Sequence, residues 1–167
     1  MFLGSSTIVI QAVEKEATLH GLIATGNVFH SWNTANNTFV LDETAGRFVN
    51  VTDTVVENNE VGPSVVRLHG KQSTRATIRA VIAPGSRSQK LDFSESLLFG
   101  SPVGIHEANC WLNVEHSCGF APGISSATSR ESTMVMVTLQ EPAPTTEGCQ
   151  VDVTCTVDQS ARVTPAH

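Results

Sequence analysis

The chain of 167 residues has no tyrosine, few aromatic residues of any kind (5 %) and few charged residues (16 %). The absence of tyrosine argues against a surface that grips sugars or peptides through several aromatic rings. No run of about 20 apolar residues exists, so we expect no membrane-spanning helix and no membrane partner. The apolar start follows no basic stretch, and a signal peptide is therefore not predicted.

Short runs of alternating apolar and polar residues fill the chain and are separated by Gly, Pro, Asn and Ser. This pattern, with abundant valine and threonine, is typical of β-strands. We therefore predict an all-β fold, a jelly-roll or β-sandwich of about 8–10 short antiparallel strands with little helix. The whole chain, 1–167, is expected to form one domain, in which 141–148 is a proline-rich loop leading to a C-terminal strand at 149–157. No fixed-period repeat and no linker is visible.

Three of these strands lie in the N-terminal third. We expect a strand at 7–13, although the same residues would also suit a two-turn helix. The stretch TFVLDETAGRFVNV predicts two strands, 38–41 and 47–51, that form a hairpin. Its loop contains Gly46, which is available for a positive φ.

Residues 106–119, HEANCWLNVEHSCG, contain two histidines and two cysteines. If 109–118 is one strand, the two sulfurs lie roughly 26 Å apart and cannot pair with each other. Alternation then places all four cysteines at core positions, namely Cys110, Cys118, Cys149 and Cys155. We expect free, buried thiols. A cross-strand disulfide between one member of each pair remains an alternative, and a zinc site is disfavoured because the spacing matches no usual ligand pattern.

The stretch EHSCGFAPG also resembles the nucleophile turn of viral chymotrypsin-like cysteine proteases. That resemblance implies Cys118 as nucleophile, with a base and an orienting acid drawn from His20 or His30 and Asp53 or Glu57. The Gly-x-Cys-Gly-Gly motif is not met, because His116 and Phe120 occupy the flanking glycine positions. We therefore expect no catalytic residues, no cofactor and no metal, and keep the protease as the second alternative.

Charge is segregated along the chain. The segment between Glu60 and Asp92 contains no acid, and its basic residues define a candidate assembly or anion-binding patch: Arg67, Lys71, Arg75, Arg79, Arg87 and Lys90. Acids crowd the segment before it and the C-terminal part, where Asp152 and Asp158 lie. Such complementary segments can steer subunits together or bind an anion, or can be ordinary solvated strand faces.

The stretches NVFHSWNTANNTFVLDETAGRFVNV and SSATSRESTMVMVTLQ resemble the opening and the final strand of single jelly-roll heads. These heads belong to the complement C1q and tumour-necrosis-factor fold, as it occurs in viral and phage fibre or decoration proteins. The resemblance covers about residues 20–140. It implies a virion structural protein of the capsid, decoration or fibre-head type, located in the virion, that assembles with itself, for example as a trimer, and docks to other virion proteins. No basic arm for a genome is present, so we expect no nucleic-acid partner.

A binding module is the first alternative to this structural role. In that case a β-sandwich, located outside the cell, would contact a receptor or glycan through loops around 30–37, 84–90 and 119–130.

Overall fold

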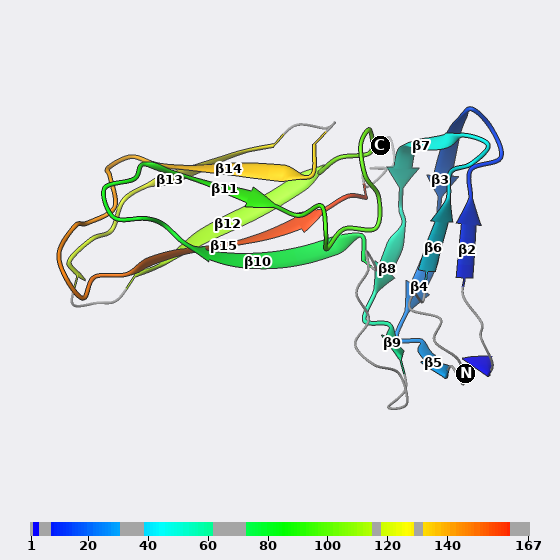
Figure 1. Ribbon diagram of the computed structural model, residues 1–167, viewed down its shortest axis with the longest axis horizontal. Coiled ribbons are helices and arrows are strands. Elements are labelled where there is room, and N and C mark those ends of the chain that lie inside the picture. Colours follow the sequence, from blue (N-terminus) through cyan, green and yellow to red (C-terminus); the bar gives the residue numbers. More distant parts are fainter. Residues whose placement is uncertain are drawn as a thin grey trace, which may run out of the picture.

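The computed structural model describes residues 2–3, 8–30, 39–61, 73–114, 118–128 and 132–160. This part contains strands and no α-helix, so the predicted all-β, sandwich-like fold is confirmed. Figure 1 shows two units side by side, a stack of parallel strands formed by residues up to 61 and a β-sandwich formed by residues from 73 onward. The described part contains no helix with the length and apolarity needed to cross a bilayer.

The first unit, which we call the coil unit, consists of two passes of the chain stacked on each other. Its strands pair in parallel, β2 with β6, β3 with β7, β4 with β8, and β1 and β9 on either side of β5. The bounds are β1 (Phe2–Leu3), β2 (Ile8–Gln11), β3 (Glu16–His20), β4 (Ile23–Thr25), β5 (Val28–His30), β6 (Phe39–Asp42), β7 (Arg47–Thr52), β8 (Val55–Glu57) and β9 (Glu60–Val61).

The two coils form a structural repeat that the sequence analysis missed. Gln11 lies over Asp42, 31 residues later, and His20 lies over Thr52, 32 residues later. The offset changes where β7 bulges beside Ala17 and Thr18. The strands predicted at 7–13, 38–41 and 47–51 all exist, but the hairpin prediction is wrong. β6 and β7 do not pair with each other, because each pairs with the strand one coil earlier.

The corners of the two coils correspond in conformation although not in sequence. Gly21 and Gly26 have positive φ values of 73° and 63°, and the matching corners of the second coil are Asp53 and Asn58, with φ of 47° and 53°. Asn and Asp are the residues other than glycine that tolerate this left-handed conformation best. The corners therefore keep one geometry with different residues, and this hides the repeat.

An asparagine pair joins the coils next to one of these corners. The side-chain oxygen of Asn59 accepts hydrogen bonds from the backbone N–H of Asn27 at 3.1 Å and from its side-chain amide at 2.9 Å. The Asn59 amide in turn donates to the Ala24 carbonyl at 2.9 Å. Because these groups are partly buried, the pair satisfies polar atoms that would otherwise be costly to enclose.

Gly46 is required for a different reason from the positive φ that we expected. Its φ is not in the left-handed region, but a Cβ built there would lie 1.7 Å from the backbone oxygen of Glu14. The Arg47 N–H donates to the Lys15 carbonyl at 3.2 Å beside this contact. The two coils thus approach so closely at this corner that no side chain fits.

The second unit is a sandwich of two three-stranded antiparallel sheets. One sheet has the order β10-β15-β12 and the other β11-β14-β13. The bounds are β10 (Arg75–Val81), β11 (Ser88–Asp92), β12 (Glu107–Val114), β13 (Ile124–Thr128), β14 (Met134–Leu139) and β15 (Val151–Asp158). Their inner faces form one core, which includes Leu91, Val135, Val137 and Val153. The proline-rich segment 141–148 connects β14 to β15, as expected.

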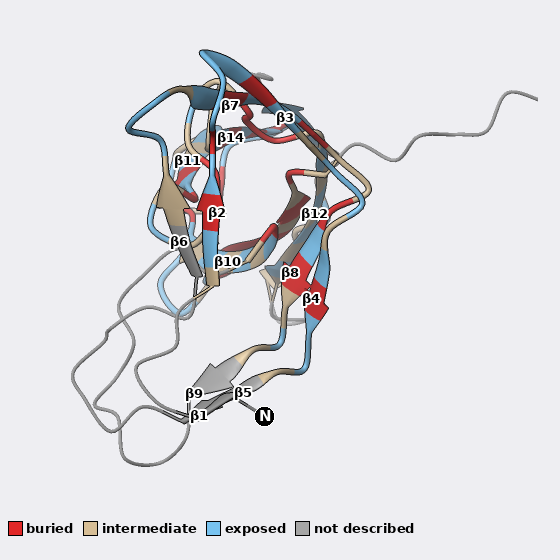
Figure 2. Ribbon diagram, turned by 90° about the vertical axis from the view of Figure 1, so that its right-hand side faces the viewer, coloured by how far each residue is buried: buried red, intermediate tan, exposed pale blue. Residues whose placement is uncertain are grey.

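The segment between β11 and β12 joins the two units. Phe93, Leu97 and Ile105 belong to the core of the sandwich. Leu98, Phe99 and Val103, from the same segment, belong to the core of the coil unit, together with buried residues such as Phe48 and Val51. Figure 2 shows single buried positions on coil strands such as β2, β4 and β8, next to exposed or half-buried ones. The sandwich therefore closes the coil unit on the side of its second coil.

The close approach at Gly46 generates a stability prediction. We expect Gly46→Ala to lower the free energy of unfolding by about 3 kcal/mol, because the backbone of Glu14 must move to admit the methyl group. Gly21→Ala is the control, since a Cβ there meets nothing within 4 Å. This control should cost only about 1–2 kcal/mol, from the left-handed φ. Urea denaturation of both variants provides the comparison, and an equal or smaller loss for Gly46→Ala would contradict the packing of this corner.

Candidate functional site

The candidate site is the solvent-facing side of the β10-β15-β12 sheet, which we call the outer polar face. Alternate residues of β10 and β12 are exposed there, while their neighbours pack on the core. The strand register arranges the outward side chains in four rows across β10, β15 and β12. The rows are Arg75, Asp158 and Glu107; Thr77, Thr156 and Asn109; Arg79, Thr154 and Trp111; and Val81, Asp152 and Asn113.

Arg79 and Asp152 form the main ion pair of this face. Both the Nε and an Nη atom of Arg79 donate to one carboxylate oxygen of Asp152, and the Gln150 amide donates to the other at 2.9 Å. The Asp152 side chain is only 6 % exposed, whereas that of Arg79 is 65 % exposed. The hydrogen bonds from Arg79 hold the pKa of the Asp152 carboxyl below its ordinary value, despite the opposing effect of burial.

Arg75 occupies the other end of the same face. It donates to Asp158 at 2.9 Å and lies 4.0 Å from a carboxylate oxygen of Glu57 in the coil unit. The hydrogen bond and the charge of Asp158 raise the pKa of Arg75. The basic and acidic segments that are far apart in the sequence thus meet within one chain, on neighbouring strands.

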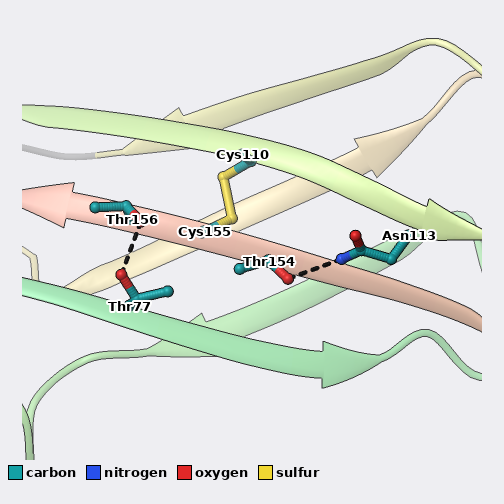
Figure 3. Close-up of a disulfide and its surroundings, with 6 residues drawn as sticks. All are labelled: Thr77, Cys110, Asn113, Thr154, Cys155 and Thr156. Atoms are coloured by element: carbon teal, nitrogen blue, oxygen red, sulfur yellow. Dashed lines mark hydrogen bonds between the residues drawn. A yellow bond between two sulfur atoms is a disulfide. The ribbon is translucent and has the colours of Figure 1, made fainter.

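Uncharged side chains fill the middle of the face. The Thr77 and Thr156 hydroxyls lie 2.8 Å apart, and the Asn113 amide donates to the Thr154 hydroxyl at 2.9 Å. Figure 3 shows both contacts, with β15 running between its two neighbours. Trp111 lies in the row of Thr154 and is 45 % exposed. An indole ring on a polar, hydrogen-bonded sheet is the most distinctive feature of this surface, and the sequence analysis did not select it.

The six basic residues of the predicted patch have different positions. Arg67 and Lys71 lie outside the described residues. Arg75 and Arg79 belong to the outer polar face, where each is paired with a carboxylate. Arg87 and Lys90 belong to the other sheet of the sandwich. Arg87 is exposed in the loop before β11, and Lys90 is exposed on β11, where it pairs with Met136 of β14. The described members therefore do not form one surface, and anion binding by the patch remains a prediction.

The cysteines correct the expectation of free thiols. Cys110 and Cys155 are directly opposite each other on β12 and β15, with Cα atoms 4.1 Å apart, and form a disulfide (Figure 3). Cys118 and Cys149 form a second disulfide, with Cα atoms 5.4 Å apart. The predicted alternative, a bridge from one cysteine pair to the other, is thus the arrangement observed, and it occurs twice. Alternation did place Cys110 and Cys155 on the core-facing side, but it cannot show whether neighbouring strands align two sulfurs.

The protease alternative depends on Cys118, whose sulfur is bonded to Cys149 in this structure. The predicted strand 109–118 ends at Val114, so Cys118 lies beyond it, and His116 is outside the described residues. Of the candidate bases, His20 lies on β3 in the coil unit, with its Nδ1 atom 2.8 Å from the Thr52 hydroxyl and 3.6 Å from Asp53. His30 lies in β5, and its side chain is outside the described part.

No group of three or more His, Cys, Asp or Glu side chains within the described ranges is arranged to bind a metal ion. The outer polar face presents hydrogen-bonding groups and one aromatic ring, which belong to Arg79, Asp152, Asn113, Thr154 and Trp111.

The disulfides generate a prediction about stability and covalent connectivity. Peptide mapping without reduction should yield the linkages Cys110–Cys155 and Cys118–Cys149. Replacing Cys110 and Cys155 together by alanine should cost about 3–4 kcal/mol in denaturant unfolding, because the bridge spans 45 residues and restricts the unfolded chain. Detection of free thiols in the native protein, or of any other linkage, would contradict the arrangement.

The lowered pKa of Asp152 generates a prediction about pH. The folded state holds this carboxylate ionised to lower pH than the unfolded state, whose ordinary value is 3.8. Its stabilising contribution is therefore complete well above pH 3.8 and is lost as the pH falls below that value. We expect Asp152→Asn to be less stable than the wild type by about 1–3 kcal/mol near neutral pH. This difference should shrink as the pH is lowered through 3.8, and a constant difference in urea denaturation across this range would contradict it.

Comparison of the chain with protein-family models, with curated proteins and with solved structures found no match.

Proposed function

We propose that this chain is a structural protein of the virion type, a capsid, decoration or fibre-head protein that acts by self-assembly and by docking to other virion proteins. The observation that carries the proposal is the coil unit, which has one closed side and one open side. The sandwich adds Leu98, Phe99 and Val103 to the core of the coil unit. Its Thr74 and Ser160 form hydrogen bonds with the backbone of the second coil at Val56 and Thr54. Strands β2, β3 and β4 of the first coil each have a partner on one side only among the described residues.

Open strand edges favour association because they present unpaired backbone donors and acceptors. Successive residues of a strand direct these groups to alternate sides. At the two ends of β3, the Lys15 carbonyl accepts from the Arg47 N–H and the Gly21 N–H donates to the Thr52 carbonyl, and both partners lie in the second coil. The odd-numbered residues from 15 to 21 therefore direct their backbone groups toward the second coil. The even-numbered residues between them, including Thr18 and His20, direct theirs to the opposite, open side.

The side chains of the first coil support the same proposal. Val9, Val13 and Ile23 are 58 %, 73 % and 74 % exposed. Large apolar side chains with this exposure are energetically suited to burial against another protein surface. Each lies next to a buried residue and so belongs to the outer face of the first coil. An oligomer that packs against this face as well as along the open edge, such as a trimer, would cover them.

The two disulfides are compatible with a protein that works outside the reducing interior of a cell, in a virion or in the extracellular space. The proposal for the virion also rests on the resemblance of two sequence stretches to viral and phage jelly-roll heads. Capsid or tail genes beside the gene for this chain would support this part of the proposal.

The open edge of β3 provides the test of self-association. Native mass measurement at low micromolar concentration should detect an oligomer of the wild-type chain. Thr18→Pro should weaken its formation by about tenfold or more, because proline removes one backbone donor from the open edge. The bond of the neighbouring Gly21 N–H to the second coil should remain, so the melting temperature should change little.

Thr18→Val is the matched control, since it keeps the N–H, the β-branched shape and the strand preference. It should assemble like the wild type. A wild-type chain that stays monomeric, or a Thr18→Pro variant that assembles as well as Thr18→Val, would contradict assembly through this edge.

A further inference from the structure

We propose that the outer polar face binds a neutral carbohydrate, with a sugar ring seated beside Trp111 in the hollow lined by Arg79, Asn113 and Asp152. This inference goes beyond the structural role and concerns a different unit of the molecule. It also differs from the loop-based glycan contact that the sequence suggested, because it assigns the contact to the face of a sheet.

Trp111 supplies the aromatic part of the site. Its indole projects from the middle of β12 and is 45 % exposed. The Cys110–Cys155 bridge, on the adjacent residue of the same strand, holds β12 to β15 at this point. The C–H groups of a sugar ring pack against an aromatic face while its hydroxyls remain available for hydrogen bonds, and the amphipathic indole suits both requirements. A tryptophan side chain has only two rotatable bonds, so it loses little conformational freedom on binding.

Arg79 and Asp152 supply an oriented charged pair. Arg79 uses its Nε and one Nη atom to bind Asp152, and the other N–H groups of its guanidinium can donate to a ligand. The buried carboxylate thus fixes an exposed guanidinium in one orientation. Such a pre-organised donor recognises adjacent hydroxyl groups with little loss of entropy.

Asn113 and Gln150 complete the polar set. Their amide nitrogens donate to Thr154 and to Asp152, and this fixes the direction in which each side-chain oxygen can accept. Arg79, Asn113, Gln150 and Asp152, together with Leu112 and Val114, line a shallow hollow of about 420 Å³, which follows the Trp111 position along β12. The hollow thus contains both donors and acceptors, which matches hydroxyl groups that act as both.

The spacing of the strands allows one ligand to contact both ends of the row. Trp111 and Arg79 lie on the two strands that flank β15, in the same row as Thr154. Two strand spacings separate their backbones by about 10 Å. Thr154 lies between them and is 9 % exposed, so its neighbours on this face cover most of it.

The distribution of charge favours a neutral sugar over an anionic one. The charge of Arg79 is compensated by Asp152, and that of Arg75 by Asp158. Glu107 adds a further acid to the row of Arg75. A sialylated, uronic or sulfated sugar would therefore meet carboxylates without an uncompensated cation, and its binding would be weaker.

The experiment is a calorimetric titration of the disulfide-intact full chain with neutral gluco-, N-acetylglucosamine, manno- and galacto-oligosaccharides, up to about 10 mM so that affinities as weak as about 1 mM are detected. At least one of the four should bind. Trp111→Ala and Asn113→Ala should each weaken this binding about tenfold or more. Met136→Ala is the matched control, because Met136 is 41 % exposed on the outer side of the opposite sheet, and it should bind like the wild type.

Fluorescence of a Trp32→Phe variant gives an independent readout, because Trp111 is then the remaining tryptophan of the two in the chain. The sugar that binds should change this emission, and its sialylated or sulfated form should do so less. Circular dichroism of each variant verifies its fold, and Asn113→Ala provides the test if Trp111→Ala does not fold.

Three results would overturn the proposal. The first is that none of the four neutral sugars binds. The second is binding that Trp111→Ala and Asn113→Ala leave unchanged. The third is a pair of observations: the wild type binds no sugar, and Trp111→Ala loses the native oligomer. That result would assign the face to contact with a second copy of the chain. Thr18 lies in the coil unit, so Thr18→Pro should still bind the sugar. Sugar binding by this variant therefore tests the carbohydrate proposal independently of self-association.

Discussion

The packing of Phe99 inside the coil unit is the contact on which the arrangement of the molecule depends. Its ring meets that of Phe48 edge-on, with centroids 5.6 Å apart. Gln159, which is fully buried, holds the Phe99 backbone by accepting from its N–H at 3.0 Å and donating to its carbonyl at 2.6 Å. Two stacked coils have too little interior to exclude water from their ends. The sandwich supplies apolar surface through Leu98, Phe99 and Val103, so the core of the coil unit includes residues of both units.

The outer polar face illustrates a second constraint, which is the central position of β15. Both of its neighbours pair with it along their whole length. Asp152 and Thr154 are therefore buried even though they point away from the core. A buried carboxylate requires compensation, and Arg79 provides it from β10. The ion pair holds the guanidinium in place, and the hydrogen bond to Thr154 of β15 orients the Asn113 amide. Trp111 remains exposed beside them. The central position of β15 thus produces an oriented polar surface.

The strands of the sandwich could be predicted because a sheet buried on one face imposes a period of two. Arg75 to Val81 and Met134 to Leu139 show this alternation in sequence and in burial. Their pairing could not be predicted, because partners such as Arg79 and Asp152 are 73 residues apart. The coil repeat was missed because most of its matching positions share geometry but differ in residue type. The Asn27–Asn59 pair and the corners at Gly21 and Asp53, 32 residues apart along the chain, were the signals that could have found it.

The sequence by itself determined the class of the fold and which strand side chains point toward the core or toward solvent. Alternation and turn residues are local signals that can be recognised within a few residues. Tertiary structure alone decided which strands became neighbours. It set Cys110 opposite Cys155, Arg79 beside Asp152 and the first coil over the second. The physical reason is that register between distant strands depends on the summed packing and hydrogen bonding of the whole sheet. No short stretch of sequence contains that sum.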